Sequence, residues 1–113
     1  LNKVVINGNV NFNLVKIGAS LNCIGSSFEN VKGDSLNFNG SNIKGNVLLK
    51  NGFLAKGEVD FSSAQIGNNF DCSQGTFISN EENKNALNCE RIKILGDVNL
   101  DKNFYLFWKV NFY

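Results

Sequence analysis

The stretch Leu36–Phe77, LNFNGSNIKGNVLLKNGFLAKGEVDFSSAQIGNNFDCSQGTF, repeats one short pattern several times. In each copy a polar residue stands between two apolar residues, as in Leu36-Asn37-Phe38, Val59-Asp60-Phe61 and Phe70-Asp71-Cys72. Alternation at period two places the apolar side chains on one face of a strand and the polar side chain on the other. No segment sustains the spacing of an amphipathic helix. The pattern therefore predicts short β-strands with an apolar inner face.

The last apolar residue of each triplet is expected to point inward, and these anchors recur in blocks. The anchors are Phe12, Ile17, Cys23 and Phe28, then Phe38, Ile43, Leu49 and Phe53, then Phe61, Ile66, Cys72 and Phe77, then Cys89, Ile94, Leu100 and Phe104. Within a block the steps are 5, 6 and then 4 or 5 residues, whereas successive blocks begin 26, 23 and 28 residues apart. Self-similarity at a period of about 20 to 50 residues is typical of repeat proteins.

We therefore expect an all-β chain that forms a parallel β-helix, or β-solenoid, of about four coils with 23–28 residues each. Each coil should have four short strands or corners. Residues 1–113 should form one domain, a fragment of a longer chain, with coils starting near residues 10, 36, 59 and 87 and a truncated fifth near residue 110. Stacked coils should lie about 4.8 Å apart, the spacing of paired strands.

The residues between the blocks and between the triplets are expected to form corners and loops. The block connectors Glu29–Ser35, Leu54–Glu58 and Ile78–Ala86 hold the variation in length, so they should be loops at one corner. Gly and Asn, as in Ile43-Lys44-Gly45-Asn46-Val47, tolerate the left-handed conformation of a sharp corner. We assign Phe12 as the first anchor, and the alternative is that Ile6 belongs to a coil further upstream.

The five-residue rhythm of Ser41-Asn42-Ile43-Lys44-Gly45 and Ala64-Gln65-Ile66-Gly67-Asn68 resembles the pentapeptide-repeat family. The resemblance covers about residues 6 to 112 and departs from the strict pattern in the six-residue step and the variable connectors. It implies a right-handed parallel β-helix. It also implies a similarity to a subgroup of bacterial repeat proteins, some of which are labelled oxidoreductases. The best-known members of the family bind protein partners or mimic DNA.

The charge balance argues against two classes of protein. The chain has 11 basic and 10 acidic residues, which argues against a basic nucleic-acid binder and equally against an acidic DNA mimic. We therefore expect no nucleic-acid partner. No apolar run approaches the ~18–20 residues of a membrane span, so none is expected in this chain.

The three cysteines, Cys23, Cys72 and Cys89, all stand at inward positions. Cys23 and Cys72 lie two coils apart, about 9–10 Å, and Cys89 belongs to another face, so no disulfide is expected. Small buried hydrophobic side chains are the expected role, and unpaired cysteines favour a reducing, cytoplasmic location. The chain has no His and no CxxC motif, so we expect no metal site.

Two surfaces and one aromatic column are singled out by the repeat. Outward-pointing residues should form rows on separate faces, and amide side chains in such rows should bond between coils. One row, Asn11, Asn37, Asp60 and Asn88, is a candidate partner surface, as are Trp108 and Phe112 at the aromatic end of the chain. Further rows are Asn22, Leu48, Asp71 and Asn99, and Lys16, Asn42, Gln65 and Lys93. The fourth anchors, Phe28, Phe53, Phe77 and Phe104, should stack inside the core.

These features favour a non-catalytic binding or scaffold module with flat polar outer faces for a protein partner. Neither a catalytic nor a cofactor motif is found, so the sequence gives no support for an enzyme and none for a cofactor. The alternative is the repeat region of a larger bacterial protein, membrane-associated or labelled an oxidoreductase, whose catalytic part lies elsewhere. An end-to-end homodimer is a further interpretation, because an open strand edge and exposed aromatic residues favour association.

Overall fold

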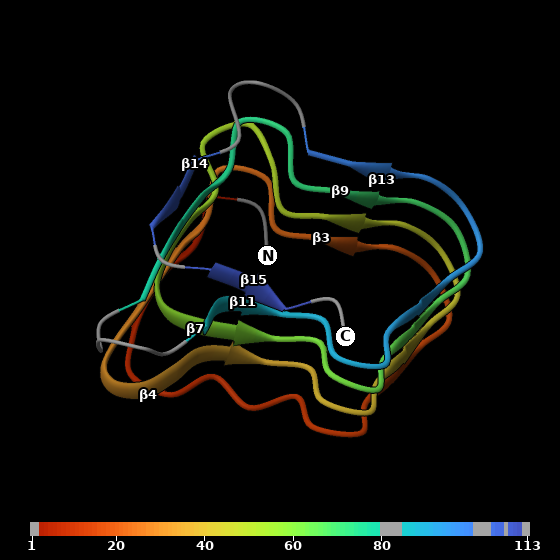
Figure 1. Cartoon of the computed structure of the whole chain (residues 1–113), viewed down its shortest axis with the longest axis horizontal. Helices are drawn as coiled ribbons and strands as arrows, with labels where there is room; N and C mark the ends of the chain where they lie inside the picture. The colour runs from red at the N-terminus through yellow and green to blue at the C-terminus, as the bar shows by residue number, and fades with distance from the viewer. Residues whose placement is uncertain (1–2, 80–84, 101–104, 108, 112–113) are drawn as a thin grey trace.

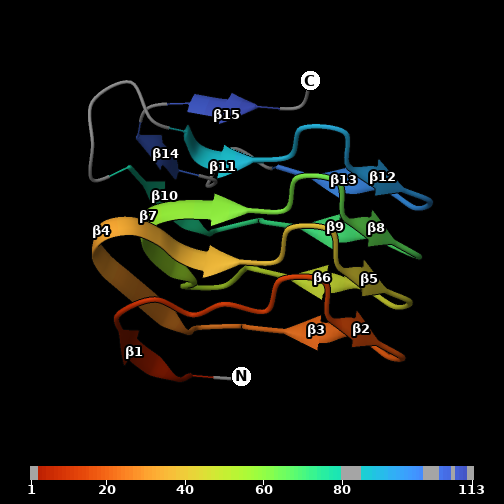
Figure 2. The same ribbon diagram turned by 90° about the horizontal axis from the view of Figure 1, so that it is seen from below.

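The chain folds as a parallel β-solenoid of about four turns (Figure 1). The computed structural model describes residues 3–79, 85–100, 105–107 and 109–111. No helix occurs in these described ranges, and every pairing between their strands is parallel. The coils rise in chain order, as the column β2, β5, β8 and β12 shows in Figure 2. The all-β solenoid predicted from the triplets is confirmed.

The strands gather into three sheets, which we call sheets A, B and C. Sheet A contains β1 (Val5–Asn7), β4 (Ser27–Asn37), β7 (Leu54–Asp60), β10 (Thr76–Ile78), β11 (Asn85–Asn88), β14 (Tyr105–Phe107) and β15 (Lys109–Asn111). Sheet B contains β2 (Lys16–Ile17), β5 (Asn42–Ile43), β8 (Gln65–Ile66) and β12 (Lys93–Ile94). Sheet C contains β3 (Leu21–Asn22), β6 (Val47–Leu48), β9 (Phe70–Asp71) and β13 (Val98–Asn99).

Two of the connectors that were expected to be loops form part of strands in sheet A. Glu29–Ser35 lies inside β4, and Leu54–Glu58 lies inside β7, so the prediction of loops at these two connectors is wrong. The longer coil is accommodated by register shifts between Glu29 and Asp34 and between Asp34 and Leu36. Glu29 and Asp34 keep backbone partners in β7, and residues 30–33 bulge out between them without leaving the strand. Residues 80–84 of the third connector are outside the described ranges.

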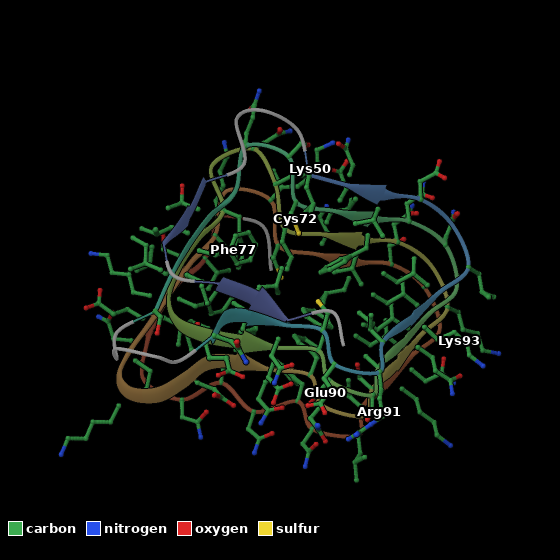
Figure 3. The ribbon with its side chains drawn as sticks, in the orientation of Figure 1. Lys50, Cys72, Phe77, Glu90, Arg91 and Lys93 are labelled. Atoms are coloured by element: carbon green, nitrogen blue, oxygen red, sulfur yellow. The ribbon has the colours of Figure 1, made fainter. Side chains whose placement is uncertain are left out.

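The core is a closed column of apolar side chains between the sheets. Burial alternates strictly along β7, where Ala55, Gly57 and Val59 are buried and the residues between them are half-buried. The middle coils supply most of the fully buried side chains, among them Ile43, Leu49, Val59, Ile66 and Phe70. Cys23, Cys72 and Cys89 are buried and unpaired, and Figure 3 shows Cys72 pointing inward. Burial of this apolar surface is the main stabilising contribution.

The phenylalanines stack, although one register differs from the expected one. The rings of Phe28 and Phe53 lie 5.9 Å apart, and those of Phe53 and Phe77 lie 5.2 Å apart. The backbone partner of both Phe28 and Phe77 is nevertheless Ala55, not Phe53. The turn before Phe53 is one residue longer than the equivalent turns of the first and third coils. The large ring of Phe53 therefore fills the space that the small Ala55 leaves. Phe104, the expected fourth ring, lies outside the described residues.

A second aromatic column runs along the start of the first three coils. Phe12 stacks on Phe38, and Phe38 on Phe61, each at 5.2 Å between ring centroids. Phe12 therefore begins this column, as the spacing predicts. Ile6 pairs with Phe28 across β1 and β4, so it occupies the row of the fourth anchor in a preceding turn. The register thus places Ile6 in the row of Phe28 and Phe12 in the row of Phe38.

Candidate partner-binding surface

The row Asn11, Asn37, Asp60 and Asn88 exists as predicted. Asn11 pairs with Asn37, and Asp60 is the backbone partner of both Asn37 and Asn88. The register of β15 adds Asn111 beside Asn88. These positions lie where sheet A ends and the chain turns toward sheet B. The other candidate partner residues, Trp108 and Phe112, lie outside the described residues.

The side chains of this row bond to their own turns and not across coils. The Oδ1 atom of Asn37 accepts the backbone N–H of Asn39 at 2.8 Å, and Asp60 accepts that of Ser62 at 2.7 Å. Asn11 and Asn88 make the same bond at 2.8 and 3.0 Å. These are Asx turns, in which a short polar side chain fixes the backbone two residues further on. The expected ladder of amides between coils is therefore wrong for this row.

Each of these turns next places a residue in the left-handed region. The residues are Leu14, Gly40, Ser63 and Arg91, with φ between 57° and 66°. The following N–H then bonds to the carbonyl three residues back, as from Ser41 to Phe38 at 3.1 Å. The Asn or Asp side chain steers the chain into this conformation, which costs a non-glycine residue free energy. The polar row is thus explained by folding, and the Oδ1 atom of each of its four side chains already accepts a turn hydrogen bond.

A ladder between coils does occur, at the corner between sheets B and C. The N–H of Asn46 donates to Ser20 Oγ at 2.9 Å, that of Asn69 to Asn46 Oδ1 at 3.0 Å, and that of Asp97 to Asn69 Oδ1 at 2.8 Å. Gly45 and Gly96 precede two of these donors without adopting positive φ. A Cβ on either would collide with the Ser20 or Asn69 side chain of the coil below. Close approach, and not the expected left-handed conformation, requires these glycines.

In the middle coils, the charged side chain of the outer row of sheet C is already held in an ion pair. Leu48 stands between Asn22 and Asp71, and Lys50 Nζ donates to Asp71 Oδ2 at 2.8 Å. Partial burial alone raises the pKa of Asp71, but hydrogen bonds from Lys50 and Ser73 outweigh it, so the net pKa lies below its ordinary value. The ion pair joins the second coil to the third. This row therefore contributes to stability, and the charge of Asp71 is already paired with Lys50.

The outer face of sheet B differs, because its polar side chains are not held by other described side chains or by turns. Lys16, Asn42, Gln65 and Lys93 form one exposed row in backbone register. Within the part of the chain that the structure describes, none of these four side chains, nor that of Lys44, makes a hydrogen bond or an ion pair. In Figure 3 Lys93 points away from the solenoid. We call the outward-facing residues of strands β2, β5, β8 and β12 and the residue after each strand the sheet B face.

The sheet B face contains a hollow of about 350 Å³, lined by Asn42, Lys44, Gln65, Ile66, Gly67, Lys93 and Leu95. Gly67 lies between Lys44 of the coil below and Leu95 of the coil above in the second row of this face. A Cβ at Gly67 would collide with the backbone carbonyl of Lys44, so no side chain can stand there. The same close contact that joins the coils therefore leaves the space open between two lysines and two amides.

The sheet B face carries positive charge only. The segments 15–19, 41–45, 64–68 and 92–96 contain Lys16, Lys44 and Lys93 and no Asp or Glu. The flanking corners hold Glu90, which pairs with Arg91 at 3.3 Å, and Asp97. On a chain of net charge +1, a face with three lysines and no acid is a local excess. Such a face attracts anionic groups and repels cationic ones.

The described residues offer little covalent chemistry. They contain no group of three or more His, Cys, Asp or Glu side chains arranged to hold a metal ion. Burial raises the pKa of Cys23 to about 11 and that of Cys72 and Cys89 further above the ordinary value, so these thiols are not poised nucleophiles. Among the described residues there is also no helix that could cross a bilayer.

The sequence predicted the row of the sheet B face, but this row was not chosen as the candidate partner surface. Lys16, Asn42, Gln65 and Lys93 were predicted to align, and they do. The hollow was missed, because the alternation of triplets gives no sign that Gly67 lies against the backbone of Lys44. The available signal was charge: the second strands of the repeat contain lysines and no acids, whereas the chosen row contains Asp60 and Asx-turn residues.

Comparison with known proteins gives no match to a family model, to a curated protein or to a solved structure.

Proposed function

We propose that the chain is a non-catalytic binding module that docks a protein partner on the sheet B face. The observation that carries the proposal is the contrast between the faces. On the sheet A row and on sheet C, polar side chains hold turns or pair with each other, whereas the sheet B face presents uncommitted lysines and amides around a hollow. A rigid, flat, polar face costs little ordering free energy on binding.

The repeat itself supports a place near the pentapeptide-repeat family. The parallel solenoid and the phrases Ser41–Gly45 and Ala64–Asn68 agree with that resemblance, and protein binding is a role known in the family. We propose a bacterial repeat protein of this general kind. The six-residue step within each coil and the strand-forming connectors of sheet A distinguish this chain from the strict pattern.

The docking proposal is tested with two charge-matched variants. Lys44→Glu with Lys93→Glu reverses the sheet B face, and Lys3→Glu with Lys32→Glu makes the same charge change at exposed positions away from sheet B. Each immobilised protein is exposed to an extract of the source cells, after a circular dichroism spectrum has shown the native fold. We expect a partner that the unmodified chain and the control variant retain and the sheet B variant loses. Equal retention by all three proteins would contradict docking on this face.

A second candidate is end-to-end association of two copies. Within the described residues, β2 and β3 pair on one side only, as do β12 and β13 at the opposite end. Apolar side chains are exposed nearby: Val5 and Leu14 at one end, and Leu95 and Val98 at the other. Open edges with exposed apolar residues favour strand pairing between chains. Sedimentation of the chain and of Leu14→Lys would detect it, and a monomer at high concentration would reject it.

A further inference from the structure

We propose that the segment recognised by the sheet B face is an extended, carboxylate-rich peptide that lies along the solenoid axis. The inference rests on the proposed docking function and adds the chemistry and the direction of the bound segment. Three observations carry it: the sign of the charge on this face, the spacing of its lysines, and the position of the hollow between them.

The charge selects the chemical class of the ligand. The polar donors of the sheet B face are the ammonium groups of Lys16, Lys44 and Lys93 and the amide groups of Asn42 and Gln65. An ammonium group only donates hydrogen bonds, and an amide can donate as well as accept. A carboxylate only accepts, and bonds between charged partners are stronger than neutral ones. Glu or Asp side chains therefore satisfy this face, whereas lysine-rich or purely apolar segments do not.

The hollow provides a defined place for one carboxylate. Lys44 and Lys93 lie on both sides of it, in the second and fourth coils, and Gln65 of the third coil lies in its lining. A carboxylate in this space is within the reach of two flexible ammonium groups and one amide. Gly67 keeps the space open, because its position carries no side chain. The hollow is shallow and solvent-exposed, so it fits a side chain of a longer chain better than a buried small molecule.

The spacing of the coils gives the direction. Lys16 belongs to the first coil, two strand spacings from Gln65, which is about 10 Å. An extended peptide advances about 3.3 Å per residue, so residues two to four positions apart span about 7–13 Å. A peptide lying along the axis can therefore place one acidic residue in the hollow and a second at Lys16. Its backbone then passes over Asn42, whose amide can bond to it.

The test uses a labelled peptide of alternating glutamate and serine, with matched peptides that contain glutamine or lysine in place of glutamate. Binding is followed by fluorescence anisotropy at about 20 mM salt and again at about 150 mM, because screening weakens exposed charge pairs. We expect the glutamate peptide alone to bind, and more weakly at the higher salt. Its affinity should fall roughly tenfold in Lys44→Gln with Lys93→Gln, from the loss of two exposed ion pairs.

The control variant is Lys3→Gln with Lys32→Gln, which removes the same charge away from sheet B. It should bind the glutamate peptide as the unmodified chain does. Equal losses in both variants would show attraction by net charge alone and overturn the proposal, as would equal binding of the glutamine peptide. A single-stranded oligonucleotide is a further probe. If it binds as tightly as the glutamate peptide and is lost in the same variant, the face takes polyanions in general and the peptide assignment is wrong.

The two proposals fail separately. If the sheet B variant loses a cellular partner while the glutamate peptide does not bind the unmodified chain, docking on this face stands and the acidic-peptide inference fails. If no partner is lost and no peptide binds, both fail.

Discussion

Ser35 and Ser41 show how differently two buried hydroxyl groups are accommodated in one core. Both side chains are almost completely buried, with exposed fractions of 0% and 1%. Ser35 Oγ donates to the carbonyl oxygen of Gly57 in the next coil at 3.0 Å. Ser41 Oγ has no hydrogen-bond partner among the described residues. An unpaired buried hydroxyl destabilises the folded state, whereas a paired one costs little.

Replacing these serines by alanine should therefore change stability in opposite directions. We expect Ser41→Ala to raise the free energy of unfolding by about 1 kcal/mol, because the folded state no longer buries an unsatisfied group. Ser35→Ala should lower it by about 1 kcal/mol, because the carbonyl of Gly57 loses a donor. Urea titrations of both variants measure the two values. A loss of stability in Ser41→Ala equal to that in Ser35→Ala would show that Ser41 has a partner in solution.

Removing a buried ring should lower the free energy of unfolding more than removing a turn hydrogen bond. Phe53→Ala removes a ring that contacts Phe28 and Phe77, and a cavity of that size costs about 3–5 kcal/mol. Asn37→Ala removes only the acceptor for the N–H of Asn39, which is worth about 1 kcal/mol. Chemical denaturation of both variants gives the comparison. Similar losses would mean that the inward and outward assignments of these residues are wrong.

The strands of this fold follow from the local alternation of apolar and polar residues, but the connections and contacts between coils do not. The triplets predict the short strands of sheets B and C and the register of every outward row, because period-two patterns repeat at fixed steps. They do not reveal that Ala55 takes the backbone position of a phenylalanine, since ring packing depends on neighbouring coils. Nor do they show that β4 and β7 continue through connectors, or that Asn37 bonds within its turn while Asn46 bonds to the next coil. Those outcomes depend on which backbone groups remain unpaired after stacking.

The link between the second and third coils at Lys50 and Asp71 should make stability depend on pH. The folded-state pKa of Asp71 lies below its ordinary value of 3.8. The ion pair therefore contributes fully above that value, and the contribution is lost as the pH falls through the lower folded-state pKa. Asp71→Asn keeps an oxygen that can accept the N–H of Ser73 but removes the charge. We expect it to cost about 0.5–1 kcal/mol near neutral pH and almost nothing at the acid end.

Urea titrations at several pH values compare the unmodified chain with Asp71→Asn. Lys50→Gln is the matched control, because it removes the other partner of the same ion pair. The two variants should lose similar amounts of stability at neutral pH and converge on the unmodified chain in acid. A difference that stays constant with pH would mean that the charge of Asp71 is not what stabilises the fold.

Across the whole molecule, burial is deepest in the middle coils and weakest at the ends. Phe38 and Phe61 are fully buried, while Phe12 at the start of the same column is 38% exposed. In the last coil Val98 and Leu100 are 45% and 38% exposed, although their counterparts Phe70 and Cys72 are fully buried. In a solenoid each coil contacts only its neighbours, so stability is approximately a sum of coil and interface contributions. The end coils should therefore open more readily than the third coil.

The cysteines can report this gradient. Cys23 lies in the first coil, Cys72 in the third and Cys89 at the start of the fourth, and burial raises the pKa of all three thiols. A thiol reagent attacks the thiolate, so reaction requires the coil to open. We expect all three thiols to react in unfolded, unreduced protein, and Cys72 to react last in the folded chain. Mass spectrometry of peptides after timed labelling measures each rate. A common rate for all three would show that the solenoid opens as one unit. Fewer than three reactive thiols in the unfolded protein would reveal a disulfide, whereas all three cysteines are free in the structure.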